Sequence, residues 1–241
     1  RIMTYNVHGC RGMDGKLSPE RIARIIIQYN PDIVALQELD VGRMRSGEVD
    51  QAREIAEDLR MDFFFHPAIQ MEEEKYGDAI LSRYPIRLVR AEGLPNRPRS
   101  PDGEPRGALW VEVSAGGRAV QFVTTHLSLD PRERMLQAGA LLGEKWIGSK
   151  ECRGPVVLCG DFNALPKSPT CRLIQRSLRD AQRELDGHRP KRTWSGRYPV
   201  GRIDHVFVGD GIEVLNVEVP RKELTRVASD HLPLIVEAQL S

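Results

Sequence analysis

Acidic, amide and imidazole side chains follow several of the short apolar segments of this 241-residue chain. Glu38 comes after the apolar run 33–36, His126 after the run 122–125, and Asp161 after the run 156–159. The pattern recurs along the chain, and the full set is Asn6, Glu38, His126, Asp161, Asn163, Asp204, Asp230 and His231. Polar groups at strand ends can converge on one rim of a sheet, where ligand sites tend to lie. We therefore expect these side chains to form one site.

Oxygen donors dominate this set, which points to a hard divalent cation. Glu38, Asn6 and Asp230 are the candidate metal ligands, and Asp161 offers further carboxylate oxygens. Oxygen ligands with few histidines suit Mg²⁺ or Mn²⁺, with Ca²⁺ as an alternative, better than zinc. Such an ion would neutralise a phosphate oxygen and stabilise charge that develops there.

The remaining polar residues could move a proton and hold a phosphate. Asp204 is the natural partner for His231, because a carboxylate fixes the tautomer of an imidazole and raises its basicity. A neutral His231 could then take a proton from water, and His126 and Asn163 would donate hydrogen bonds to phosphoryl oxygens.

Each piece also has an ordinary structural interpretation when it is taken alone. The tripeptide Asp161-Phe162-Asn163 could form an Asx-turn, and Ser229-Asp230-His231 could be a cap or a turn. His126 alone is more often a structural histidine than a catalytic one. The argument for chemistry therefore depends on the ordered set and not on any single residue.

The ordered set resembles the endonuclease/exonuclease/phosphatase superfamily, the deoxyribonuclease-I-like phosphoesterases. The resemblance covers nearly the whole chain. The matching segments are Thr4-Tyr5-Asn6-Val7, Ala35-Leu36-Gln37-Glu38, Ala79-Ile80-Leu81-Ser82-Arg83, Thr125-His126-Leu127, Gly160-Asp161-Phe162-Asn163, Arg202-Ile203-Asp204-His205 and Ser229-Asp230-His231-Leu232-Pro233.

The resemblance implies a fold and a set of roles. The fold would be an α/β (α+β) four-layer sandwich of two packed mixed β-sheets flanked by helices, with residues 1–241 as one catalytic domain. The resemblance implies that Glu38 binds the metal with Asn6 and Asp230 nearby. Asp161 would orient or deprotonate the attacking water, or help to bind a second metal. Asn163 and His126 would hold the phosphate, and Asp204 would orient His231. We take His231 as the general base, with Asp161 as the alternative.

The chain departs from the family pattern at position 78. Many bacterial relatives have Gly-Asn-Ala where this chain has Gly77-Asp78-Ala79. The aspartate could change phosphate contacts, add a metal ligand or have a purely structural place at the strand edge. We favour the structural role.

The elements that must position these residues can be read from apolar periodicity and from caps. Ser18 followed by Pro19 predicts the start of a helix that ends before Pro31, and the proline- and glycine-rich segment 94–107 predicts a loop. Further helices are expected at 50–59, 132–146 and 169–177. Strands are expected at 1–5, 33–36, 63–66, 78–82, 85–90, 108–113, 119–125, 155–159, 203–208, 213–219 and 232–238.

Composition excludes some classes of protein. The net charge of +1 does not indicate a strongly basic nucleic-acid binder, although local patches can exist. No apolar run of about 18 residues is present, so no membrane span is expected. Neither a signal-peptide pattern nor a zinc-type cysteine spacing is present, which favours a cytoplasmic location. A monomer is expected.

Substrate specificity must depend on the loops around the site, because the fold alone does not determine the substrate. Arg106 in the loop 94–107 and Trp194 in the basic loop 187–202 are the candidate substrate contacts, since arginine and aromatic residues suit phosphate and bases. Trp194 could instead anchor its loop in the core. The acidic run 71–74 would repel a long polyanion. His8 is a weaker candidate for substrate contact, and strand alternation makes His205 structural.

The expected activity is therefore metal-dependent hydrolysis of a phosphoester by an activated water, in a nuclease or phosphodiesterase. The alternatives are a phosphomonoesterase or a lipid-headgroup, sphingomyelinase-like phosphodiesterase, and, least favoured, a non-catalytic scaffold with the same fold. The partner would be a phosphoester substrate, with nucleic acid as one candidate.

Overall fold

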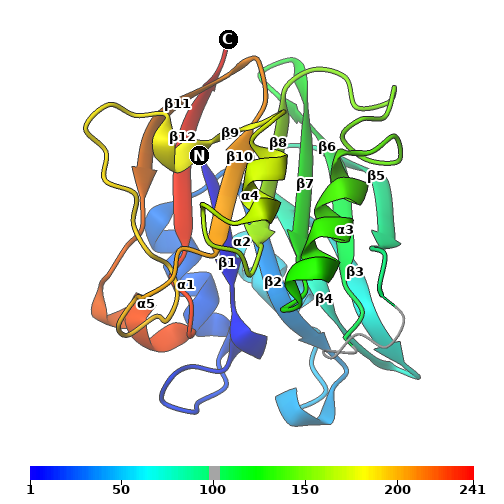
Figure 1. The fold of residues 1–241 in the computed structure, drawn as a ribbon. Helices are drawn as coiled ribbons and strands as arrows, with labels where there is room; N and C mark the ends of the chain where they lie inside the picture. Colours follow the sequence, from blue (N-terminus) through cyan, green and yellow to red (C-terminus); the bar gives the residue numbers. More distant parts are fainter. Residues whose placement is uncertain (98–103) are drawn as a thin grey trace.

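Two six-stranded β-sheets packed face to face form the centre of the computed structural model, which describes residues 1–97 and 104–241 (Figure 1). The first sheet has the order β11 (Ile212–Glu218), β12 (Leu234–Leu240), β1 (Ile2–Asn6), β2 (Ile33–Val41), β4 (Glu74–Ser82) and β3 (Asp62–Met71). The second has the order β5 (Ile86–Gly93), β6 (Gly107–Ala115), β7 (Arg118–His126), β8 (Val156–Asp161), β10 (Asp204–Val208) and β9 (Arg179–Asp180).

Both sheets are mixed. Strand β1 runs parallel to β2 and β7 runs parallel to β8, whereas the other paired neighbours are antiparallel. All four of these strands run toward the lower end of the molecule in Figure 1. The residues at their carboxyl ends therefore lie near one another.

Helices cover the outer face of each sheet and complete the four layers that the sequence predicts (Figure 1). The first sheet is covered by α1 (Pro19–Tyr29), α2 (Gln51–Leu59) and α5 (Glu223–Ala228), and the second by α3 (Pro131–Leu142) and α4 (Pro169–Ile174). Ser18 caps α1 by accepting a hydrogen bond from the backbone N–H of Arg21, and Pro19 takes the first helical position, where its missing N–H costs nothing. In the described ranges no helix combines the length and the apolar character needed to cross a membrane.

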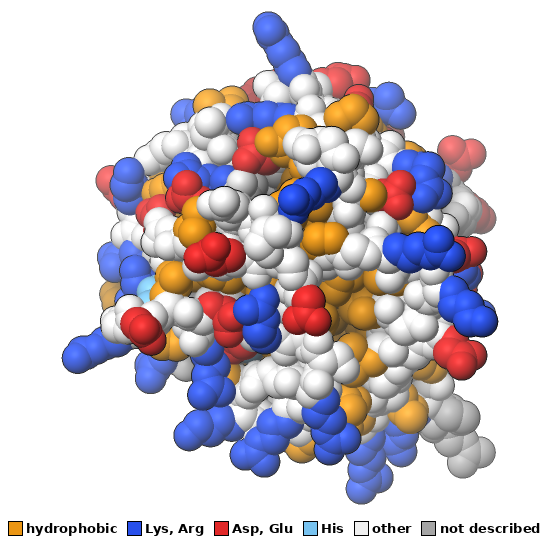
Figure 2. All heavy atoms as spheres, turned by 90° about the horizontal axis from the view of Figure 1, so that it is seen from above, with side chains coloured by type: hydrophobic (Ala, Val, Ile, Leu, Met, Phe, Trp, Pro, Cys, Tyr) orange, Lys and Arg blue, Asp and Glu red, His pale blue; other side chains and the backbone are white. Residues whose placement is uncertain are grey.

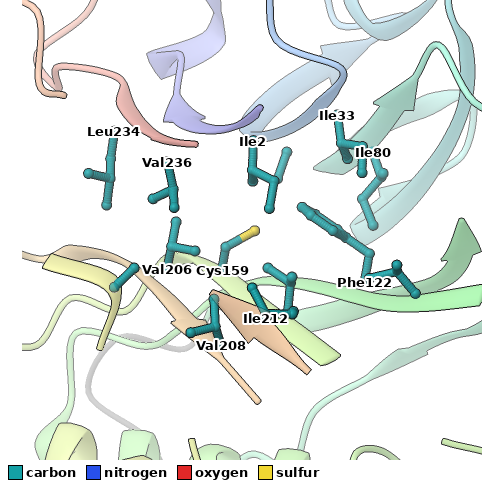
Figure 3. Packing of buried hydrophobic residues seen from close by; sticks show 14 of the residues in the cluster. Ile2, Ile33, Ile80, Phe122, Cys159, Val206, Val208, Ile212, Leu234 and Val236 are labelled. Carbon is teal, nitrogen blue, oxygen red and sulfur yellow. The ribbon is translucent and has the colours of Figure 1, made fainter. Parts of the chain in front are cut away.

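A core of aliphatic residues fills the space between the two sheets (Figure 3). Ile2 and Ile33 from the first sheet face Phe122 and Cys159 from the second. Successive strand residues point to opposite faces, so the inward positions continue from this core toward the strand ends. In β1 the side chains that point toward the second sheet begin with Ile2 and end with Asn6. In β8 Cys159 points toward the first sheet, and so does Asp161, two residues later. The end of the inter-sheet space is therefore lined with polar side chains.

Several predicted boundaries shift in the structure. The helix expected to reach residue 146 ends at Leu142, because Gly143 leaves the helical conformation with φ −80° and ψ 178°. The strand expected at 63–66 continues to Met71, so the acidic run 71–74 forms a hairpin turn between β3 and β4. The short elements η1 (His8–Cys10), η2 (Met44–Ser46), η3 (Ala181–Arg183), α5 and β9 were not predicted.

The end of the molecule opposite the polar strand ends carries mixed charge. Figure 2 shows this end, viewed from above in the orientation of Figure 1, with basic and acidic side chains interspersed among hydrophobic ones. This distribution agrees with the small net charge.

Candidate active site

Most of the predicted site residues line one cavity of about 510 Å³ at the carboxyl ends of β1, β2, β7 and β8. They come from both sheets and from the loops that follow them. The predicted residues that line it are Glu38, Arg106, His126, Asp161, Asn163, Trp194, Asp230 and His231. Asn6 and Asp204 lie behind these residues and are buried.

Asp204 holds His231 through one ring nitrogen. Nδ1 of His231 lies 2.9 Å from Oδ2 and 3.1 Å from Oδ1 of Asp204. Nε2 of His231 faces Asp161, 3.6 Å from Oδ2. Both carboxylates and the imidazole are almost fully buried. Nδ1 is therefore hydrogen-bonded to Asp204, and Nε2 can bind a water or a substrate oxygen.

The imidazole of His231 and the carboxyl of Asp161 influence each other's ionisation. Burial alone would lower the pKa of His231, but the charges of Asp204 and Asp161 outweigh burial and raise it. Burial raises the pKa of Asp161, and the positive charge of His231 opposes that rise. The two groups therefore compete for a proton, and His231 binds that proton more strongly than an ordinary histidine would.

A break in β2 turns Glu38 into the site. Regular alternation would place Gln37 toward the second sheet and Glu38 toward the helices. The pairing of β2 with β4 shifts between Leu36 and Leu39, and Glu38 has a positive φ of 63°. Such a bulge re-aims a side chain. Burial opposes ionisation of Glu38, but His8, His126 and Asn6 together hold its pKa well below the usual range.

Asn6 joins the two key carboxylates. Its Nδ2 donates to Oε1 of Glu38 at 2.7 Å and to Oδ2 of Asp161 at 3.0 Å. Its Oδ1 accepts a hydrogen bond from the backbone N–H of His8 at 3.1 Å. The structure therefore presents the amide nitrogen, not the predicted ligand oxygen, to the carboxylates. In this arrangement Asn6 positions Glu38 and Asp161.

Arg106 fixes the tautomer of His126. Nη1 of Arg106 lies 3.0 Å from Nδ1 of His126. Arginine can only donate, so Nδ1 must accept and the proton of the neutral ring must lie on Nε2. Burial and the charge of Arg106 lower the pKa of His126 to about 3. His126 is thus a neutral hydrogen-bond donor at physiological pH.

The donors of His126 and Asn163 converge. Nε2 of His126 lies 3.1 Å from Nδ2 of Asn163, and that amide also donates to the backbone oxygen of Leu127 at 2.9 Å. Two N–H groups cannot bond each other, so Nε2–H of His126 and the second N–H of the Asn163 amide remain for other acceptors; Oδ2 of Asp161 lies 3.5 Å from Nε2. Arg106 is 5 % exposed, and its Nη1 is shared between His126 and Glu104, the latter at 3.1 Å. It lines the cavity, but this nitrogen acts through His126.

Asp230 and His8 complete the rim on the side of the first sheet. Nδ1 of His8 lies 3.5 Å from Oδ1 of Asp230 and 3.6 Å from Oε2 of Glu38. The sequence made His8 a weaker candidate for substrate contact. The chain leaves β1 there, and the positive φ of His8 and Gly9 brings the imidazole back to the site.

Asp78 lies beneath the site and is almost fully buried. Its carboxylate accepts a hydrogen bond from the backbone N–H of Glu38, and the charge of Arg106 lies nearby. Burial raises the pKa of Asp78 to about 8. The position supports the structural role that the sequence favoured.

Trp194 and Leu129 supply apolar surface at the mouth of the cavity, and 39 % and 60 % of these residues are exposed. Trp194 therefore does not anchor its loop in the core, which was one of the two interpretations. A β-bridge between Trp194 and His231 holds the loop against the site. His205 points away from the cavity, as alternation predicts, and its Nε2 lies 2.8 Å from the backbone oxygen of Ala164.

The donor set fits a hard cation. One atom each from Glu38, His126 and Asp161 lies within 4.8 Å of the other two, and the same holds for Asp161, Asp204 and His231. Because Nε2 of His126 carries a proton, Glu38 and Asp161 are the members of the first cluster that can bind a cation. The carboxylates of Glu38 and Asp161 face each other across the amide of Asn6. A buried and a partly buried carboxylate this close are favoured when a cation neutralises them.

Known proteins share both the sequence pattern and the fold. The model of the endonuclease/exonuclease/phosphatase family matches residues 3–231. The uncharacterized protein YbhP of Escherichia coli strain K12 is 28 % identical over 256 residues, which covers all of this chain and 96 % of YbhP.

Two solved structures illustrate the similarity of fold. An endonuclease/exonuclease/phosphatase from Beutenbergia cavernae superposes with a TM-score of 0.76 at 25 % identity, covering all of this chain and 71 % of that one. The mannosyl-6-phosphatase of Bacteroides thetaiotaomicron superposes with a TM-score of 0.78 at 20 % identity, covering 99 % of each chain. With a family match over nearly its whole length, the chain belongs to the endonuclease/exonuclease/phosphatase family, whose members are phosphoester hydrolases.

Proposed function

We propose that this protein is a divalent-metal-dependent phosphoesterase that cleaves a P–O bond by in-line attack of water. The observation that carries the proposal is the line of buried groups Asp204, His231 and Asp161 beside Glu38. A proton acceptor, its orienting carboxylate and a cation-binding carboxylate thus meet in one cavity. This combination suits the activation of water next to a phosphoryl group.

The attacking water would lie within hydrogen-bond distance of both Nε2 of His231 and Oδ2 of Asp161, which are 3.6 Å apart. When His231 starts neutral, the proton of this water passes to its Nε2, and the carboxylates that raise the pKa of His231 hold the proton there. Asp204 stabilises the imidazolium that forms, as an orienting carboxylate does. Asp161 either relays the proton or orients the water, so both residues are needed.

Glu38 and Asp161 would hold the cation. Asp230 lies nearby, because the imidazole of His8 contacts both Glu38 and Asp230. When bound, Mg²⁺ or Mn²⁺ supplies positive charge that neutralises a phosphoryl oxygen and stabilises the transition state. Asn6 fixes the positions of the two carboxylates through its two hydrogen bonds.

His126 and Asn163 would hold the other phosphoryl oxygens. Both point a donor into the cavity, and Arg106 prevents His126 from presenting its acceptor nitrogen there. Donors fixed in advance stabilise developing negative charge without reorganisation. Arg106 therefore contributes through the hydrogen-bonding state of His126.

A phosphodiester is the substrate class that we place first, with a phosphomonoester or a lipid headgroup as the alternatives. Trp194 and Leu129 at the mouth offer apolar surface for the second organic group, which a diester carries and a monoester lacks. The printed activity of the Bacteroides thetaiotaomicron neighbour, a phosphatase for a mannosyl phosphate, keeps the monoesterase alternative open. A silent scaffold is disfavoured because the described residues retain the whole predicted set.

The test compares bis-p-nitrophenyl phosphate, p-nitrophenyl phosphate and a DNA oligonucleotide with an abasic site, each with Mg²⁺ or Mn²⁺. We expect His231→Ala and Asp161→Ala to lose at least about a hundredfold in turnover, as loss of acid–base catalysis typically does. His188→Ala serves as the matched control, because His188 lies outside the cavity. Near-normal turnover by either folded active-site variant would overturn the mechanism.

A further inference from the structure

A second cavity of about 260 Å³ opens beside the catalytic one. The two cavities share His8, Glu38 and Tyr76 as walls, so a ligand can extend from one into the other. The far side of the second cavity is built by η1 and η2, two loop elements that the proposed mechanism does not use.

Hydrogen bonds hold the two loops together without any ligand. The buried side chain of Gln51 accepts from the backbone N–H of Asp40 at 2.9 Å and donates to the backbone oxygen of Gly9 at 2.8 Å. Arg11 donates from Nη2 to the backbone oxygen of Arg45 at 2.9 Å. The cavity walls are therefore formed in advance, which reduces the entropy lost when a ligand binds.

Arg45 is fixed in the wall by a buried carboxylate. Its Nε and Nη2 donate to the two oxygens of Asp40 at 2.8 Å and 2.7 Å, and its guanidinium lies 5.4 Å from the centre of the Tyr76 ring. The side chain of Asp40 is 2 % exposed, whereas that of Arg45 is 54 % exposed. One edge of the guanidinium is thus anchored, and in the described part of the chain Nη1 makes no hydrogen bond.

Arg11 adds a positive charge that no described carboxylate neutralises. Its Nη1 and Nη2 donate to the backbone oxygens of Gly15 and Arg45, both at 2.9 Å. Asp40 offsets Arg45 and is itself buried, and a cation would offset Glu38. The two arginines balance Asp40 and Glu38 in the wall of this cavity, so the cavity would carry an excess of positive charge when a cation offsets Glu38. Exposed guanidinium groups favour phosphate and carboxylate ligands.

We propose that the second cavity is a subsite for a second anionic group, a phosphate or a carboxylate. The substrate would carry this group together with the phosphoryl group that reacts in the catalytic cavity. The preferred substrate is then a compact molecule with two anionic groups, because the cavity holds one small group. This inference rests on the proposed function for the position of the reacting phosphate, but the binding that it predicts does not depend on turnover.

The test uses two probes that differ in one group. Glycerol 3-phosphate carries a phosphate alone, and 3-phosphoglycerate carries a phosphate and a carboxylate. Titration calorimetry in Mg²⁺ measures both dissociation constants. We expect the wild-type protein to bind 3-phosphoglycerate about tenfold more tightly, which is typical of one hydrogen bond to a charged group. We expect Arg45→Gln to bring this ratio close to one.

Arg43→Gln is the matched control. Arg43 also lies near Asp40, at 3.6 Å, and over the ring of Tyr76, at 5.8 Å, but it does not line the second cavity. It should therefore keep the ratio of the wild type. Arg11→Gln gives a second variant if Arg45→Gln does not fold, and it should reduce the ratio.

Equal binding of the two probes by the wild type, binding of neither probe, or a ratio unchanged in both Arg45→Gln and Arg11→Gln would overturn the subsite. Hydrolysis of bis-p-nitrophenyl phosphate is measured separately for each variant. Its absence in the wild type would count against the proposed function, whereas the binding ratio would still decide the subsite.

Discussion

Replacement of Asp78 by asparagine should stabilise the protein, and by more at high pH than at low pH. Asp78 is buried in β4 below the catalytic cavity, and burial raises the pKa of its carboxyl from 3.8 to about 8. In the unfolded chain the carboxyl loses its proton near pH 4, whereas in the folded chain it keeps the proton up to about pH 8. Between these values the folded state holds one more proton than the unfolded state, so the free energy of unfolding falls as the pH rises.

The size of the effect follows from the shift. Each pKa unit corresponds to about 1.4 kcal/mol, so a shift of roughly four units sets an upper limit of about 6 kcal/mol at pH 9. Water that reaches the carboxylate and relaxation around it reduce such penalties, and we expect about 3 kcal/mol. For a chain of this length that corresponds to an increase of about 6–12 °C in the melting temperature.

The assay is thermal unfolding of the wild type and Asp78→Asn in EDTA, followed by circular dichroism from pH 5 to pH 9. The difference in melting temperature should grow with pH and level off above about pH 8, because asparagine has no proton to lose. Asp40→Asn is a contrasting control and should destabilise the protein, since Asp40 accepts two hydrogen bonds from Arg45. A variant at position 78 that is less stable than the wild type at pH 9 would refute the reasoning. It would show an ionised Asp78 that Arg106 stabilises.

Two further predictions concern the site itself. Asp204→Asn should lower turnover at least about a hundredfold with an unchanged circular dichroism spectrum, because the proton on His231 loses its stabilising charge; activity within tenfold of the wild type would remove Asp204 from the mechanism. Mg²⁺ at about a hundred times its dissociation constant should add about 2.7 kcal/mol to the free energy of unfolding, measured as a rise in melting temperature. Glu38→Gln should abolish that rise, and an equal rise in both proteins would place the cation elsewhere.

The layers of the fold could be predicted because each element carries local signals. The cap Ser18, the terminators of the helices and the alternation of the strands depend on near neighbours in the chain. The convergence of Asn6, Asp161 and His231 depends instead on the packing of two sheets. Sequence order alone suggested it through the resemblance to the family, and the structure supplies the contacts.

The parts that the sequence missed are long-range or conformational. The bulge that turns Glu38 inward depends on the pairing of β2 with β4, which no local pattern reports. The bond between Arg106 and His126 crosses 20 positions and assigns a tautomer that composition cannot show. Tyr76 and Glu104 also line the cavity without belonging to any motif. Arg106 was expected to contact substrate, and its proximity to His126 was not expected.

The most direct test of the central claim is the turnover of bis-p-nitrophenyl phosphate by the wild type in Mg²⁺, after EDTA, and after Mg²⁺ is restored. The account predicts that EDTA abolishes turnover and that Mg²⁺ restores it, because the carboxylates of Glu38 and Asp161 need a cation beside the phosphate. Turnover that persists undiminished in EDTA would contradict the account.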